Sequence, residues 1–228
     1  MAPKSHGAVN AISIISVVGV AVATAAIVIV LSVFNGFRYH LNARLDTLTT
    51  DVSVLPAYGK TIENGDSLTE VLKGFSGIAE VMPEITDNAL VIAGSKEMPI
   101  TLKGVSPKTF SQITSIDSLL MDGSPVEDYS RRQASIAVGV AQRLGLYAAG
   151  DTLFLFAPKR HGRLNIANPL SSFFTDSIEV ASIFRSMQNE FDENTIIADI
   201  DVARELFQYE TQVTSLQIKA APGIDPSG

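Results

Sequence analysis

The chain has 228 residues, a formal net charge of −7 at pH 7 and a pI of about 4.9. This acidic balance, without a basic stripe interleaved with aromatic residues, argues against nucleic acid as a partner. The chain contains no cysteine, which excludes a disulfide scaffold and thiolate metal sites.

The first element along the chain is an uncharged, apolar run over residues 12–34. At about 1.5 Å per residue, a helix of this length extends ~34 Å, enough to cross a ~30 Å hydrocarbon core. A buried core helix and a cleaved signal peptide are the alternatives. The run is longer than the ~7–15 apolar residues of a signal peptide, and its polar residues are small hydroxyls that can bond back to their own helix. The sequence therefore predicts one membrane span.

A polar segment follows the span. Phe37, Leu41, Leu45 and Leu48 recur at helical spacing between charged and amide residues. This pattern predicts an amphipathic helix, either a stalk that leaves the membrane or the first helix of a soluble domain. The positive-inside rule gives only a weak orientation, and it leans toward placing the following domain inside, because Lys4 precedes the span whereas two arginines follow it.

The rest of the chain reads as short strands and helices. Residues 51–57, 81–93 and 98–105 read as strands, and a capping box at Ser67 and Glu70 predicts a helix over 68–73. Residues 107–116 read as a helix, 122–125 as a turn, 135–138 as a strand and 140–144 as a short helix. Strands at 152–157, 178–184, 195–200 and 213–220 and a helix at 201–207 complete the pattern. Residues 158–177 show no periodicity, and loops longer than about 12–15 residues are usually functional or disordered.

The signatures of catalysis and metal binding are missing from the sequence. There is no G-x-x-x-x-G-K-[ST] phosphate loop and no G-x-S-x-G nucleophile elbow. The three histidines are too scattered for a metal site. An acidic cluster lacks the calcium-loop register, and turn and cap positions account for it; its members are Glu190, Asp192, Glu193, Asp199 and Asp201. We therefore expect no enzyme activity and no catalytic, cofactor or metal residue in this chain.

Four stretches of the sequence carry a family resemblance. The span "AISIISVVGVAVATAAIVIVLSVFNGF", followed by a polar helix, is similar to the first membrane helix of type VII ABC transporter permeases. The segments "SIAVGVAQRLGLYAAGDTLFLFAP", "IEVASIFRSMQNEFDENTIIADIDVARELF" and "VTSLQIKA" follow in the family's order and spacing. The chain most resembles the lipoprotein-releasing permeases (the LolC/LolE group), with MacB and FtsX permeases as more distant relatives.

The resemblance implies an α+β fold: one N-terminal transmembrane helix with a stalk, then a periplasmic domain with Porter-like β-α-β units and a β-rich, Sabre-like insert. The expected divisions are an N-terminal segment at 1–10, the transmembrane helix at 11–35, the stalk at 36–50, Porter-like parts at 51–105 and 191–221, the insert at 106–190, and a loop at 222–228 toward a membrane helix absent from this chain. We therefore expect the chain to be part of a longer permease.

The resemblance also implies location and partners. We expect the protein in the bacterial inner membrane, with its domain in the periplasm. The partners would be a cytoplasmic ATPase subunit, which hydrolyses the ATP, a second permease copy or paralogue, a periplasmic lipoprotein carrier, and a lipoprotein or lipid. The permease would couple ATP hydrolysis to periplasmic movement by mechanotransmission.

The resemblance further singles out two groups of residues. The segment 158–177 falls where one lipoprotein-releasing permease carries a hook that recruits the carrier, so Arg160, Arg163, Pro169 and Phe173 are expected to contact a partner; a plain surface loop is the alternative. Val28, Val33 and Phe34 are expected to face lipid, where acyl chains could lie.

Two other functions remain open at this stage. One keeps the family and changes the cargo, to export of small molecules or peptides or to control of cell-wall hydrolases. The other is a membrane-anchored periplasmic binding or scaffolding domain.

Overall fold

The computed structural model describes residues 5–45, 50–130, 132–159 and 172–224, and they form two units, residues 1–45 and residues 46–228. The first unit is a single helix, α1 (Ser5–Leu45). It contains a candidate membrane span over Ile12–Gly36, with a mean hydropathy of 2.9 and no part of it buried within the protein. Hydroxyls of Ser16 and Thr24 donate to backbone oxygens one turn earlier, at 3.0 and 2.8 Å, so the predicted back-bonding is confirmed.

The helix continues beyond the span as the predicted stalk helix. It passes Gly36 and ends at Leu45, and the rest of the predicted stalk lies outside the described residues, apart from Thr50. One helix therefore accounts for both the span and most of the stalk.

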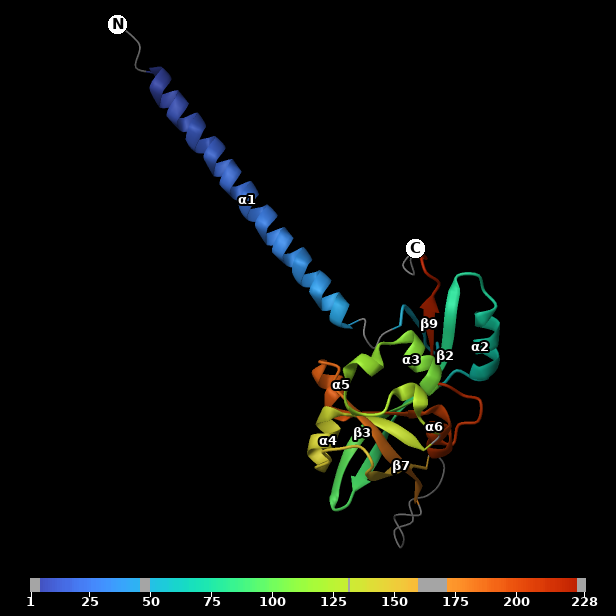
Figure 1. Cartoon of the computed structure of the whole chain (residues 1–228). Helices are drawn as coiled ribbons and strands as arrows, with labels where there is room; N and C mark the ends of the chain where they lie inside the picture. The colour runs from blue at the N-terminus through green and yellow to red at the C-terminus, as the bar shows by residue number, and fades with distance from the viewer. Residues whose placement is uncertain (1–4, 46–49, 131, 160–171, 225–228) are drawn as a thin grey trace. The chain divides into compact units, whose positions relative to one another are not determined.

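The second unit begins with a small antiparallel sheet built from both ends of the domain (Figure 1). The sheet has the order β1-β9-β2, in which β9 (Ser215–Ala220) lies between β1 (Val52–Val54) and the first half of β2 (Ile78–Ala93). Helix α2 (Gly65–Lys73) packs on β2. We call this part the three-stranded sheet.

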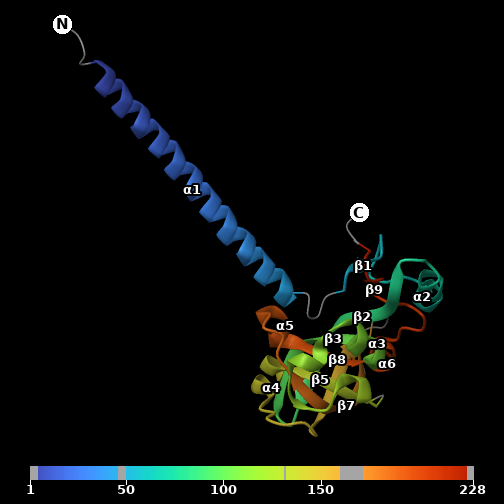
Figure 2. The same ribbon diagram turned by 45° about the horizontal axis from the view of Figure 1, so that its top comes forward.

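The remaining strands close into a barrel of six strands. The second half of β2 pairs with β3 (Lys96–Val105), which pairs with β8 (Thr195–Asp199), and β8 pairs with β5 (Gln133–Ala137). The ring continues through β7 (Phe173–Phe184) and β6 (Thr152–Pro158) back to β2, while β4 (Leu120–Gly123) adds to β7 outside the ring. Figure 2 shows β3, β8, β5 and β7 together at one end of the domain and β1, β9 and α2 at the other. The long strand β2 belongs to both parts.

Alternating apolar side chains fill the barrel. On β3 and β6, for example, buried residues alternate with more exposed ones, as expected for strands with one face in a core. The interior residues with no exposed surface include Val91, Leu102, Ile136, Leu155, Val180 and Ile196. Helix α6 (Ile200–Phe207) contacts β2, β3, β6, β7 and β8 and buries Val202, Ala203, Leu206 and Phe207. Shorter helices complete the domain: α3 (Pro107–Ile113), α4 (Val138–Leu144), α5 (Asn189–Asn194), and the 3-10 turns η1 (Ile116–Leu119) and η2 (Val126–Asp128).

The structure corrects one local prediction about a helix start. The capping box at Ser67 is wrong, because α2 already begins at Gly65, with Asn64 in the left-handed conformation (φ 53°) before it. Tertiary contacts determine this start. The Gly65 amide donates to Thr211 O at 2.8 Å, and a Cβ at Gly65 would lie 2.4 Å from Val213. Packing against the segment before β9 therefore overrides the local capping signal.

Three other elements also differ from the prediction. Strand β7 begins at Phe173 rather than residue 178, because its first residues pair with β6. The predicted turn at 122–125 overlaps β4, and α5 was not predicted. The reading of the acidic cluster is confirmed at Asp199, which caps α6 by accepting from the Asp201 amide at 2.8 Å. Asp192 lies within α5, where it accepts three hydrogen bonds from Ser186 and Met187 before the helix.

Candidate partner-binding site

The strands β6 and β7 hold both ends of the segment 160–171 in fixed positions. They pair antiparallel up to Pro158 opposite Phe173, and the Lys159 amide then donates to Ser172 O at 2.9 Å. The ladder thus extends to the last described residue on each side. Whatever this segment binds, its base is a paired hairpin of the barrel.

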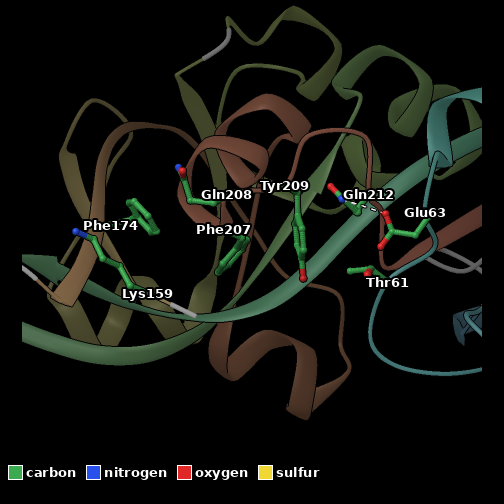
Figure 3. Close-up of a pocket in the computed structure, with 8 residues that line it drawn as sticks. All are labelled: Thr61, Glu63, Lys159, Phe174, Phe207, Gln208, Tyr209 and Gln212. Carbon is green, nitrogen blue, oxygen red and sulfur yellow. Dashed lines mark hydrogen bonds between the residues drawn. The ribbon is translucent and has the colours of Figure 1, made fainter. Parts of the chain in front are cut away.

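A cavity of about 310 Å³ opens beside this base (Figure 3). Lys159 and Phe174 lie at one end of it and Thr61 and Glu63 at the other, with the residues around the end of α6 between them. The side chains that line it are Thr61, Glu63, Lys159, Phe174, Phe207, Gln208, Tyr209 and Gln212.

Three aromatic rings form the apolar part of the cavity. The Nζ of Lys159 lies 5.0 Å from the centre of the Phe174 ring, within the range of a cation–π contact. The rings of Phe207 and Tyr209 have centres 6.4 Å apart in a tilted arrangement, a favourable geometry for aromatic pairs. Most of the surface of both rings is buried, so their positions are fixed by the core.

The end of α6 explains how these rings come together. The helix stops at Gln208, which adopts the left-handed conformation (φ 56°), and the Tyr209 amide donates back to Arg204 O at 3.0 Å. This αL cap reverses the chain, so that Phe207 and Tyr209 line one cavity. Farther along, the Gln212 Nε2 donates to Glu63 Oε2 at 3.1 Å. The cavity thus has an aromatic middle, an ammonium at one end and a carboxylate at the other.

This chemistry fits recognition and offers no catalytic pair. Among the described residues, no group of three or more histidine, cysteine or acidic side chains could hold a metal ion. The hydroxyl group with a perturbed pKa lies elsewhere, at Tyr129, where burial raises the pKa above its usual value of 10.0. Its hydroxyl bonds Ser182, which bonds Ser135 at 2.8 Å, so this is a buried hydroxyl network of the core.

The predicted site residues fall in different places. Arg160, Arg163 and Pro169 lie outside the described residues. Phe173 is the first residue of β7 and is half-buried opposite Pro158, on the other face of the strand from Phe174. Val28, Val33 and Phe34 are exposed on α1, at 56%, 68% and 57% of their full area. Partner and lipid contacts of all these residues stay predictions.

Sequence reasoning missed most of the cavity. Glu63, Phe207, Tyr209 and Gln212 come from segments without a recognisable motif, and folding alone brings them beside Lys159. The available signal was indirect. An apolar residue just beyond a helix end, as Tyr209 is here, frequently packs back on the last turn of the helix.

Comparisons with known proteins match almost the whole chain. The family model of the MacB-like periplasmic core domain matches residues 13–227. The chain is 24% identical over 208 residues to the lipoprotein-releasing system transmembrane protein LolE of Haemophilus influenzae, covering 90% of this chain and 49% of that protein. It is also 24% identical over 226 residues to LolC of Neisseria meningitidis, covering 96% and 52%. The chain therefore spans about half the length of the curated relatives it matches.

A solved structure shares the fold. The extracellular domain of the noncanonic ABC-type transporter YknZ from Gram-positive bacteria superposes with a TM-score of 0.52 at 11% identity, over 73% of this chain and 77% of that one. At this identity the likeness concerns the fold alone.

Proposed function

The chain belongs to the MacB-like periplasmic core domain family, and from this membership we propose that it forms the N-terminal part of an ABC transporter permease that releases lipoproteins from the inner membrane to a periplasmic carrier. One observation carries the proposal. The similarity to two transmembrane proteins of lipoprotein-releasing systems runs through 90% and 96% of the chain. It therefore includes both the apolar helix and the domain.

The proposal places ATP hydrolysis on a separate ATPase subunit, as the family resemblance implies. These 228 residues contain no phosphate-binding loop of the G-x-x-x-x-G-K-[ST] type, which is consistent with this arrangement. The span Ile12–Gly36 anchors the domain, and a second permease copy or paralogue completes the transporter. Val28, Val33 and Phe34 present apolar surface to lipid, where an acyl chain of the cargo can lie.

We further propose that the segment 160–171 and the cavity at its base bind the carrier. Arg160, Arg163, Pro169 and Phe173 make the contacts expected of a hook. The paired base at Lys159 and Ser172 supports this role, because it anchors the segment to a rigid barrel. A partner seated there meets Lys159 and Phe174 at one end and Glu63 at the other, because Phe207 and Tyr209 are buried in the core and offer little surface.

Reconstitution tests the transport function. The native full-length permease, its ATPase and a fluorescent lipoprotein are placed in proteoliposomes with soluble carrier outside. We expect ATP-dependent transfer of lipoprotein to the carrier, abolished when the phosphate-loop lysine of the ATPase is replaced. The alternative outcome is that no lipoprotein tested is released, whereas a small molecule or peptide is exported in an ATP-dependent way. That result would assign the protein to the exporter branch of the family.

A separate experiment tests the carrier site. Replacing residues 160–171 by a short glycine-serine linker removes the segment and keeps the Lys159–Ser172 hydrogen bond. We expect carrier capture in a pull-down to fall to background, whereas Tyr147→Ala, at an exposed residue outside the cavity, leaves capture unchanged. Unchanged capture by the linker variant would show that the carrier binds elsewhere. For the lipid contacts, a photo-crosslinker at Val33 should capture lipoprotein in the assembled transporter.

A further inference from the structure

The strand β2 passes from the three-stranded sheet to the barrel at a single peptide bond. Glu84 is the last residue of β2 that pairs with β9, opposite Ser215, and Ile85 is the first that pairs with β3, opposite Gly104. Any change in the angle between the two parts must therefore bend the chain at this point. The side chains around it decide how easily it bends.

The backbone at this junction is fixed by Thr214. Its amide and hydroxyl both donate to Glu84 O, at 2.9 and 3.0 Å, and its hydroxyl accepts from the Thr86 amide at 2.8 Å. Thr214 thus bridges the place where β2 leaves one partner strand and joins the next. These bonds fix the backbone of β2 where it changes its partner strand from β9 to β3. The side chain of Glu84 lies on the side of the barrel.

A buried ion pair joins the two parts across the same point. Glu84 Oε2 lies 2.9 Å from Lys103 Nζ on β3, and both side chains are mostly buried, at 7% and 15% exposed. Thr86 Oγ1 donates to Glu84 Oε1 at 2.9 Å, whereas Oε2 accepts no hydrogen bond from the described residues. The ammonium also lies 5.7 Å from the ring centre of Phe110 and 6.0 Å from that of Phe191. The carboxylate oxygen is therefore satisfied by charge attraction to Lys103 alone.

Space for movement lies beside the pair. A cavity of about 330 Å³ is lined by Glu84, Lys103, Phe191 and, on α5, Glu190. Glu190 lines the same cavity as Lys103 and forms no ion pair with any described residue, so it is a candidate second partner for the ammonium. A buried pair adds little net stability compared with apolar packing, and such pairs are often explained by the conformation they specify.

We propose that the Glu84–Lys103 pair is a latch that holds the three-stranded sheet and the barrel at one angle, and that Lys103 exchanges Glu84 for Glu190 when that angle changes. The proposal rests on the proposed function in one respect. In a mechanotransmission permease, force reaches the domain through β1, which follows α1 in the chain, and through β9, and both strands belong to the three-stranded sheet. The latch then determines when this force moves the barrel.

Distance measurements test the latch without any transport assay. The chain has no cysteine, so Val71→Cys on α2 and Ser95→Cys in the β2–β3 turn give two unique sites for spin labels in the full chain in nanodiscs. In the native background we expect one distance, with any second arrangement below about 10%. In Glu84→Gln, which leaves Glu190 as the partner of Lys103, we expect the second distance to predominate. In Lys103→Met, which removes both pairs, we expect the two distances to be populated about equally. The charge swap Glu84→Lys with Lys103→Glu should restore the single distance.

Matched controls make the result decisive. Lys219→Met removes a surface ion pair with Asp51 (3.4 Å) inside the three-stranded sheet, and it should leave the distance unchanged. Adding Glu190→Gln to Glu84→Gln should reduce the population of the second distance, because it removes the alternative partner of Lys103. If Lys103→Met fails to fold by circular dichroism, Glu84→Gln carries the test, since it keeps the acceptor for Thr86. A native distance in Glu84→Gln, or no recovery in the swap, would overturn the latch, whatever cargo the transporter carries.

Discussion

Replacing Gly104 by alanine tests how closely α6 packs on the barrel. A Cβ at this position would lie 2.4 Å from Ala203 Cβ and 3.3 Å from Ile200 Cα. The first distance is far below contact, and the second involves backbone, so the whole helix must shift to make room. Helix α6 buries four side chains against the barrel, and these would lose part of their packing.

The expected magnitude follows from the cost of overpacking a core. Inserting a methyl group into a well-packed interior typically costs about 1–3 kcal/mol. For a domain of this size, each kcal/mol lowers Tm by roughly 2–4 °C. We therefore expect Gly104→Ala to lower the Tm of the domain by roughly 2–12 °C.

A compensating substitution isolates the contact. Ala203→Gly removes the methyl group that a Cβ at 104 would meet, at a cost of about 1 kcal/mol in helix propensity. The double variant should be more stable than the sum of the single changes predicts, by about 1 kcal/mol or more. Gly74→Ala is the matched control. Its Cβ meets only Val71 O, at 3.3 Å, at an exposed helix end, and the effect should stay within about 0.5 kcal/mol.

Thermal unfolding of the full chain in detergent, followed by circular dichroism, measures the native protein and the four variants. The reasoning is refuted if Gly104→Ala melts with the native Tm. It is also refuted if the loss of Tm in the double variant equals the sum of the losses in the two single variants.

Three further predictions concern other parts of the chain. Burial raises the pKa of Tyr129, so above pH 10.0 the folded state keeps its proton while the unfolded state loses it, and the free energy of unfolding should fall as pH rises from there. Tyr129→Phe should flatten this fall, as measured by urea titrations at several pH values. An unchanged dependence of stability on pH would contradict this prediction. Asp192→Ala removes three hydrogen bonds from Ser186 and Met187 and should cost about 1–3 kcal/mol, with faster hydrogen exchange at both amides. Unchanged exchange would argue against a stabilising role of these bonds. Arginines at both Ala23 and Ile27 should cost roughly 5–7 kcal/mol of insertion and release the chain from carbonate-washed membranes, and full retention would refute the span.

The sequence was most informative where one local pattern decides the structure. The apolar run at 12–34 predicts the helix that contains Ile12–Gly36, and the neighbouring runs at 81–93 and 98–105 predict the strands β2 and β3. Both features depend on neighbouring residues only.

The closed barrel could not be predicted from the sequence in the same way. Its closure depends on β6 pairing with both β2 and β7, with Leu90 opposite Phe156 and Phe156 opposite Thr175. No local pattern specifies such distant pairs. The start of α2 at Gly65 and the cavity beside Lys159 have the same origin, because each depends on contact with the segment between α6 and β9. Phe174 lies in a segment that showed no periodicity in the sequence, and the cavity side chains beside it come from residues more than thirty positions later.

The position of β9 between β1 and β2 has a consequence for biosynthesis. The ribosome completes α1 and β1 first, yet β1 has no hydrogen-bonding strand until residues 215–220 have been made. Synthesis of the apolar helix and of β1 therefore precedes assembly of the small sheet by more than 150 residues of translation. During that interval β1 is an unpaired strand, which is a surface open to wrong pairing and aggregation.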